Sequence, residues 1–269
     1  MSLLDGIVHK AKQHTKTIVL PEGKDSRIVA AAKTVHTQQI ANIIVLVNEA
    51  DVTDEITSLQ EFGIRVEIIE QSSRLKTSST MLLELRKAKG KTKEQAKQLE
   101  LNSIYFGVMM VKNGDADGMV SGAITATSDV LRPALQILKT AQNVSLVSSF
   151  FLMDIPTSTQ IPNGVYAFSD CGLIVNPTAE ELVEIAFQTA KSFDYLLNKE
   201  PRVAMLSYST KGSAGGELVD KVVRATTTIQ EKYPNLKVDG ELQLDAAIIP
   251  DVAKLKAPLS TVAGQANVL

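Results

Sequence analysis

The 269-residue sequence contains one cysteine and three histidines. A single cysteine, Cys171, excludes an internal disulfide, and no Cys/His cluster has the spacing of a structural zinc site. All three histidines lie within the first 36 residues, which disfavours a Ser-His-Asp triad in the remainder of the chain. We therefore expect Asp or Glu side chains to act as any general acid or base. For Cys171 itself, a buried and inert thiol is favoured over a nucleophile.

Long apolar runs and a surplus of either charge are also missing. No segment reaches the roughly 18 apolar residues of a membrane span. Residues 1–14 mix charged with apolar residues, unlike a secretory signal, so we expect a cytoplasmic protein. The 28 basic and 30 acidic side chains give a net charge of −2. That balance disfavours nucleic-acid binding and leaves small anionic ligands open.

Short β-branched runs alternate with helical patterns through most of the chain, which is typical of parallel α/β sheets covered by helices on both faces. Asp25 or Ser26 is expected to cap the first helix of this pattern, and Thr178 and Glu181 have capping-box spacing at the start of another. The pattern resets near residue 144, so we predict two domains, 1–143 and 144–269. The predicted strands are 17–20, 43–47, 65–69, 165–168 and 203–207.

One strand-to-helix loop, residues 115–129, carries the strongest ligand-binding signal, and we predict that it leads into a helix starting at Arg132-Pro133. Its glycines allow close backbone approach, and a helix N-terminus favours an oxyanion. Arg132 adds a planar cationic fork suited to phosphate. The alternative is a capped turn in which Arg132 pairs with a nearby carboxylate. The hydroxyls that could bond an oxyanion belong to Ser121, Thr125, Thr127 and Ser128.

Three further segments are candidates for anion binding, and the weakest of them is the strand-to-helix loop 21–24 (PEGK). The loop 207–216, with Ser209 and Lys211, could cradle phosphate, but it lacks the glycine spacing of a Walker A loop or a dinucleotide fingerprint. A flexible connection is the alternative there. A basic run from Arg86 to Lys97 is either a solvated helix face or a patch that attracts a polyphosphate.

Residues 115–122 (DADGMVSG) and 129–136 (DVLRPALQ) closely resemble the pattern of the phosphate acetyltransferase family. Several other blocks are similar to the family, stand in the expected order and together span nearly the whole chain. They are PEG (21–23), LRK (85–87), VNPT (175–178), LSYSTKGS (206–213), DGELQ (239–243) and AGQANVL (263–269).

The resemblance implies two three-layer α/β/α domains with mostly parallel sheets, as in isocitrate and isopropylmalate dehydrogenases, around a cleft. It implies reversible transfer of an acetyl group between coenzyme A and phosphate by direct thiolate attack, with arginines holding the phosphate. Coenzyme A and acetyl phosphate would be substrates, with no metal and no permanently bound cofactor. A cytoplasmic homodimer is the family's usual form.

The resemblance also assigns residues. Arg132 and Arg86 are expected to act in catalysis on the phosphate. The resemblance implies substrate binding by Ser128, and the chemistry of the two loops adds Thr127, Ser121, Ser209 and Lys211 to the expected substrate-binding residues.

Family members continue for several tens of residues after the block that ends at Leu269, which looks like the opening of a buried strand. That further segment carries a Ser-Arg pair and the aspartate expected as thiol base, and it completes the first domain. We therefore expect that the sequence is part of a longer protein or a truncated form. A genuine 269-residue product should be poorly stable and weakly active.

Three other functions compete with phosphate acetyl transfer. A phosphate butyryltransferase would share these motifs, because they do not report the size of the acyl pocket. A non-catalytic module that binds acetyl-CoA would share the fold. A nucleotide-binding oxidoreductase of related architecture is disfavoured, because the chain has no dinucleotide fingerprint.

Overall fold

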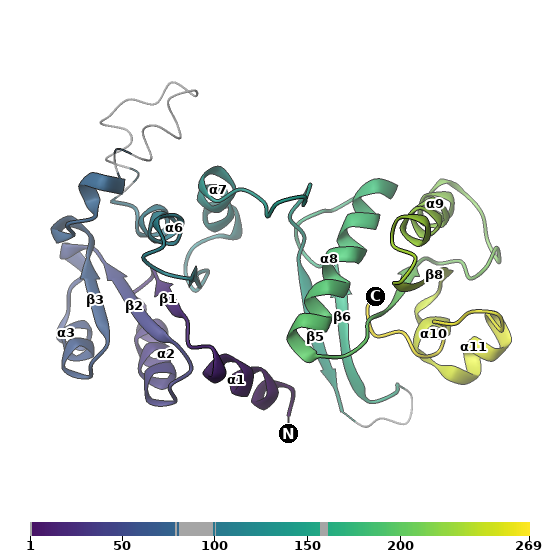
Figure 1. The fold of residues 1–269 in the computed structure, drawn as a ribbon, viewed down its shortest axis with the longest axis horizontal. Helices are drawn as coiled ribbons and strands as arrows, with labels where there is room; N and C mark the ends of the chain where they lie inside the picture. Colours follow the sequence, from purple (N-terminus) through teal and green to yellow (C-terminus); the bar gives the residue numbers. More distant parts are fainter. Residues whose placement is uncertain (1, 79, 81–98, 100, 157–160) are drawn as a thin grey trace. The chain divides into compact units, whose positions relative to one another are not determined.

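The computed structural model describes residues 2–78, 80, 99, 101–156 and 161–269 (Figure 1). The chain forms two compact units, one of residues 8–139 and one of residues 1–7 with 140–269. The division falls between residues 139 and 140, and the domain boundary after residue 143 stays a prediction. Among the described residues, no helix is both long enough and apolar enough to span a membrane.

The 8–139 unit is built on a four-stranded parallel sheet with the order β3-β2-β1-β4. Ile18 at the centre of the sheet pairs with Ile43 on one side and with Gly118 on the other. The first three strands lie where the β-branched runs predicted them, and the fourth is very short. The bounds are β1 Thr17–Leu20, β2 Asn42–Val47, β3 Arg65–Ile68 and β4 Gly118–Met119.

Helices cover both faces of this sheet because successive strand residues point to opposite sides. Val45 and Val47 share a buried cluster with α2 and α3, whereas Ile44 and Leu46 pack with α6. Asp25 caps α2, as predicted, by accepting a hydrogen bond from the backbone of Arg27. The helices of this unit are α2 Ser26–Thr37, α3 Asp54–Glu61, α6 Ser103–Asn113 and α7 Thr127–Ile137, with short 3-10 turns η1 Glu49–Asp51 and η2 Ile69–Gln71. Helix α1, Leu3–Gln13, crosses the division between the two units.

The second unit has an antiparallel pair and a parallel pair of strands, joined by residues 267–269. Val268 forms parallel bridges with Ala167 on one side and Val203 on the other. The Leu269 amide donates to the Ala167 carbonyl at 2.8 Å. The prediction of a buried strand opening here is confirmed. The strands are β5 Phe150–Ile155, β6 Gly164–Ser169, β7 Arg202–Leu206 and β8 Lys237–Leu242.

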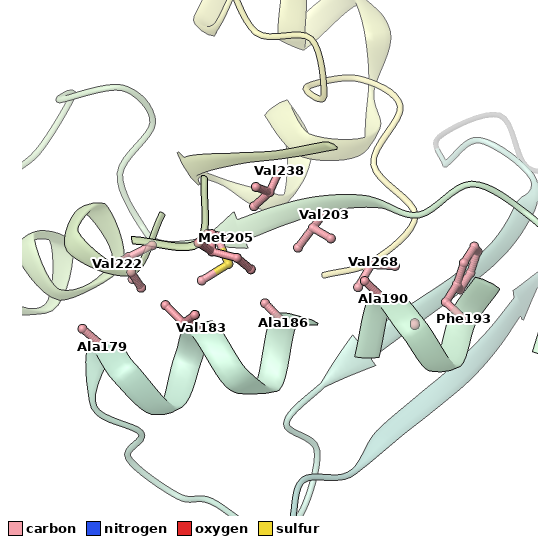
Figure 2. Packing of buried hydrophobic residues seen from close by; sticks show 13 residues of the cluster. Ala179, Val183, Ala186, Ala190, Phe193, Val203, Met205, Val222, Val238 and Val268 are labelled. Atoms are coloured by element: carbon pink, nitrogen blue, oxygen red, sulfur yellow. The ribbon is translucent and has the colours of Figure 1, made fainter. Parts of the chain in front are cut away.

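Helices α8 (Ala179–Leu197) and α9 (Glu217–Lys232) cover one face of these strands. Figure 2 shows the apolar side of α8 turned toward the strand residues Val203 and Met205 and toward Val268. The short helices α10 Leu244–Ile248 and α11 Pro250–Lys256 pack in the cluster on the other face. The structure is thus a mixed α/β fold with helices on both faces of its strands, which confirms the predicted fold class; the 8–139 sheet is parallel, whereas the second unit combines an antiparallel pair with a parallel pair.

Candidate active-site loops and family membership

The 8–139 unit has a topological switch point between β1 and β4. The chain proceeds from β1 to β2 and β3 on one side of the sheet and then returns to place β4 on the other side. In open parallel sheets, ligands bind beyond the carboxyl ends of the strands at such a point. The loops that begin there are residues 21–25, after β1, and residues 120–126, after β4. These loops are the candidate site of this unit.

The two loops are joined through one buried side chain, Glu22, which is only 4% exposed. Its Oε2 accepts the backbone N–H groups of Gly122 and Ala123 at 2.8 and 2.9 Å. Its Oε1 accepts those of Ile124 and Thr125 at 3.0 and 2.8 Å. Burial acts to raise the pKa of Glu22, but the hydrogen bonds from this loop outweigh it and lower the pKa from 4.5 to about 2. Glu22 is therefore held as a carboxylate.

This arrangement corrects the expectation that the backbone of the 115–129 loop can bind a substrate phosphate at its glycine-containing turn. Four consecutive backbone amides form an anion-binding concavity, and the anion they hold is the protein's own carboxylate. The sequence could not reveal this, because Glu22 lies about a hundred residues before its partners. In this structure these four amides are bonded to Glu22 and are not free for another anion.

A second side chain restrains the same loop. The Nη2 atom of Arg27 donates to the carbonyl of Ala123 at 2.8 Å and to Oδ2 of Asp25 at 2.7 Å. Asp25 is the N-cap of α2 and Arg27 lies in its first turn, so the loop after β4 is bonded to Glu22 in the loop after β1 and, through Arg27, to the helix that follows.

The helix after this loop, α7, starts at Thr127, so the predicted start at Arg132-Pro133 is wrong. Pro133 lies inside the helix, and Arg132 lies about one turn after Ser128. The Nη2 atom of Arg132 contacts Oδ1 of Asp129 at 3.3 Å, and the two side chains are 59% and 56% exposed. The pairing that the alternative anticipated is present. Because an exposed pair contributes about 0–1 kcal/mol, Arg132 can exchange it for an anionic ligand at small cost.

A cavity of about 520 Å³ opens beside these loops. Lys24, Thr125 and Asp129 contribute to its lining, together with the first residues of α6. Lys24 offers positive charge, whereas Asp51 and Asp129 are acidic. The first amides of α6 are bonded to the side chain of Asn102. The cavity is thus suited to a polar ligand. The other lining residues are 21–23, 46–48, 102–104, 124 and 126.

The second predicted loop, 207–216, also closes on a buried glutamate. Ser209 is fully buried, and its hydroxyl donates to Oε1 of Glu241 at 2.9 Å. The Gly212 amide donates to the same oxygen at 2.7 Å. Lys211 pairs with Asp239. In the structure, Ser209 and Lys211 therefore bind groups of the protein itself and fix the loop 207–216. The loop is not merely the flexible connection that the alternative described.

The chain is similar to known proteins along its whole length. The family of phosphate acetyl/butaryl transferases matches residues 2–269. The chain belongs to this family. It is 49% identical over 269 residues to a phosphate acetyltransferase of Acetivibrio thermocellus, covering all of this chain and 81% of that protein. It is 51% identical over 274 residues to a phosphate acetyltransferase of Thermoanaerobacterium thermosaccharolyticum, covering all of this chain and 82% of that protein.

A solved structure agrees with this assignment. A phosphotransacetylase from Streptococcus pyogenes superposes with a TM-score of 0.89 at 40% identity, covering all of this chain and 81% of that one. The resemblance read from the sequence blocks is confirmed.

Two of the predicted residues lie in the first turn of α7, and a third lies in the loop before it. Thr127 and Ser128 are its first two residues. The Ser121 hydroxyl is buried and has no hydrogen-bond partner in the described part of the chain. Arg86 and the basic run that follows it lie outside the described residues. Ser209 and Lys211 belong to the other unit, and the structure does not place the two units relative to one another.

Cys171, expected to be buried, is only half-buried. Its Sγ contacts the hydroxyl of Ser149 at 3.4 Å, and the neighbouring Asp170 accepts from the Ser149 amide and hydroxyl. Burial acts to raise the pKa of Asp170, but hydrogen bonds, led by those from the amides of Leu173 and Gly172, lower it to about 2. No group of three His, Cys, Asp or Glu residues in the described ranges could hold a metal ion.

Sequence reasoning missed the glutamates that shape these loops. Glu22 stands in the PEG block and Glu241 in the DGELQ block. Both blocks supported the resemblance, but neither glutamate was predicted to have a role. For Glu22 the available signal was a carboxylate in a short loop directly after a buried strand, where the amides of neighbouring loops converge. Glu241 lies within β8 and carried no such signal.

Proposed function

We infer that the protein is a phosphate acetyltransferase, which transfers an acetyl group reversibly between coenzyme A and phosphate. The observation that carries this conclusion is the match along the whole chain to proteins named phosphate acetyltransferase, at 49% and 51% identity. The family also includes butyryl transfer. The names of these two relatives favour the acetyl group.

In the proposed reaction the coenzyme A thiolate attacks the carbonyl carbon of acetyl phosphate. A C–S bond forms while the bond from the carbonyl carbon to the phosphate oxygen breaks, and inorganic phosphate leaves with the electron pair. Arg132 would bind the phosphoryl oxygens through its guanidinium fork, releasing Asp129, and stabilise the charge that develops on them. Arg86 is proposed as a second arginine for this phosphate.

The remaining predicted residues would assist binding. Thr127 and Ser128 stand where a helix N-terminus adds partial positive charge, so their hydroxyls and amides suit a phosphate oxygen. Ser121 offers a buried hydroxyl without a partner among the described residues. Ser209 and Lys211 would contact substrate only after giving up the bonds to Glu241 and Asp239, so their proposed role is the weaker one.

We propose that coenzyme A and acetyl phosphate are transient substrates, with no resident cofactor and no metal. The protein would act in the cytoplasm as a homodimer. Light scattering coupled to gel filtration checks the last point, because a homodimer gives twice the mass of the chain.

The decisive experiment is an assay of free thiol released from acetyl-CoA by the purified protein. Release is expected only when inorganic phosphate is present, with acetyl phosphate as the second product. Butyryl-CoA, assayed in parallel, should give a lower kcat/KM than acetyl-CoA. A higher kcat/KM for butyryl-CoA would favour the butyryltransferase. Binding of acetyl-CoA without phosphate-dependent thiol release would favour the non-catalytic module.

A further inference from the structure

The buried carboxylate of Glu22 lies at the switch point, yet the proposed reaction does not use it. We propose that Glu22 is a positioning residue for phosphate: it fixes the loop 122–125 and thereby places the first turns of α7, with Ser128 and Arg132, for the phosphoryl group. This inference rests on the proposed function and goes beyond it, because it gives a role to a residue that does not contact substrate.

The first step of the argument is that Glu22 is committed to the loop. Each of its two oxygens accepts two backbone N–H groups, at distances of 2.8–3.0 Å. The side chain is 4% exposed. With its oxygens occupied in this way, the carboxylate cannot also accept a proton from a substrate thiol without leaving the loop amides unpaired. Its effect on the reaction must therefore pass through the loop.

The second step is that the loop is continuous with α7. Thr125 donates its amide to Glu22, Ala126 is the N-cap of α7, and Thr127 is the first helical residue. Ala126 has no polar side chain with which to cap the helix. The position of the first turn of α7 is consequently fixed by the backbone that precedes it. A shift of that backbone would move Ser128 and Arg132 together.

The third step concerns the anion that the loop amides would otherwise attract. Converging backbone amides bind phosphate and carboxylate alike. By filling this concavity from within, Glu22 keeps substrate phosphate out of it and leaves Arg132 and the exposed start of α7 as the donors for phosphate. Removal of the carboxylate should both loosen the loop and open a competing anion site.

The test compares Glu22→Ala with Glu22→Gln by steady-state kinetics, varying phosphate and acetyl-CoA separately. In both variants we expect the KM for phosphate to rise at least about tenfold, while the KM for acetyl-CoA changes less than about twofold, because misplaced binding groups weaken only the ligand they hold. Millimolar formate should partly restore turnover in Glu22→Ala, since its carboxylate can occupy the vacated amides. It should not restore Glu22→Gln, whose side chain still fills the space.

Glu67→Ala is the matched control. Glu67 is another mostly buried carboxylate of the same unit, and it pairs with Arg65 and Arg74. Its removal should lower the melting temperature without changing the KM for phosphate and without a response to formate. If Glu22→Ala does not fold, Glu22→Gln and Glu22→Asp still report the KM for phosphate.

Two negative outcomes are distinguishable. Absence of phosphate-dependent thiol release by the unsubstituted protein would reject the proposed function. Normal release by that protein, with an unchanged phosphate KM in every folded Glu22 variant or with no effect of formate on Glu22→Ala, would overturn the positioning role alone.

Discussion

The carboxylates of Glu22, Asp170 and Glu241 accept hydrogen bonds from backbone amides. These amides lie in the loops that follow strands β4, β6 and β7. Such loops have the chemistry of phosphate-binding loops, namely converging amides and nearby hydroxyls, but here a side chain of the protein supplies the anion. A sequence shows that a loop can bind an anion and does not show whether a distant glutamate already occupies it. That is why the character of the 115–129 loop was predictable and its occupant was not.

At this scale the sharpest kinetic prediction concerns Arg132. Arg132→Ala should lower kcat/KM for phosphate by about 10²–10³-fold, as when a single donor to a reacting anion is removed. Stability should fall by less than about 1 kcal/mol, because the pair with Asp129 is mostly exposed. Thiol release and urea unfolding provide the two measurements. Arg65→Ala, which breaks another partly exposed pair, is the control and should retain activity. Equal kcat/KM in both variants would refute the role of Arg132.

Gly23, next to Glu22, lies where there is no room for a side chain. A Cβ at this position would stand 2.5 Å from the carbonyl oxygen of Leu46 and from Cγ1 of Val45. Gly23→Ala should therefore destabilise the protein by about 3 kcal/mol, since backbone must move to admit the methyl group. Gly215→Ala is the control, because no atom lies within 4 Å of its added Cβ. Urea unfolding that shows the same loss for both variants would contradict this account.

At the scale of elements, the local signals in the sequence were reliable. The strand Thr17–Leu20 and the capping box of α8 lie where apolar runs and polar spacing predicted them. The start of α7 was missed because a proline usually marks the first turn of a helix, whereas Pro133 lies inside this one. Strand pairing was beyond local reasoning: residues 267–269 contact β6 and β7, which are distant in sequence.

The capping box itself is testable. The Thr178 hydroxyl accepts the Glu181 amide at 3.2 Å, and the Glu181 carboxylate accepts the Thr178 amide at 2.8 Å. Thr178→Ala should cost about 1 kcal/mol of unfolding free energy, the usual effect of losing an N-cap. Thr227→Ala, on the exposed side of α9, removes a hydroxyl that bonds only within its helix and should cost clearly less. Urea denaturation of both variants measures the difference, and equal losses would rule out the cap as the cause.

At the scale of the whole molecule, both units contain a loop carboxylate whose pKa is lowered to about 2: the buried Glu22 in one and the half-buried Asp170 in the other. A group with a lowered pKa in the folded state stabilises that state fully above its ordinary pKa and loses this contribution as the pH falls toward the folded value. The unfolding free energy should therefore decline as the pH falls from 4.5 toward 2 through Glu22, and from 3.8 toward 2 through Asp170.

The prediction can be divided between the units by substitution. Glu22→Gln should be less stable than the unsubstituted protein at pH 7, and its stability should depend less steeply on pH below 4.5, because the titrating group is gone. Asp170→Asn should act in the same way below 3.8. Urea unfolding at several pH values, followed by circular dichroism, gives the slopes, and Glu231→Gln controls for loss of an exposed carboxylate. Parallel pH profiles for all four proteins would show that acid acts on the fold through other groups.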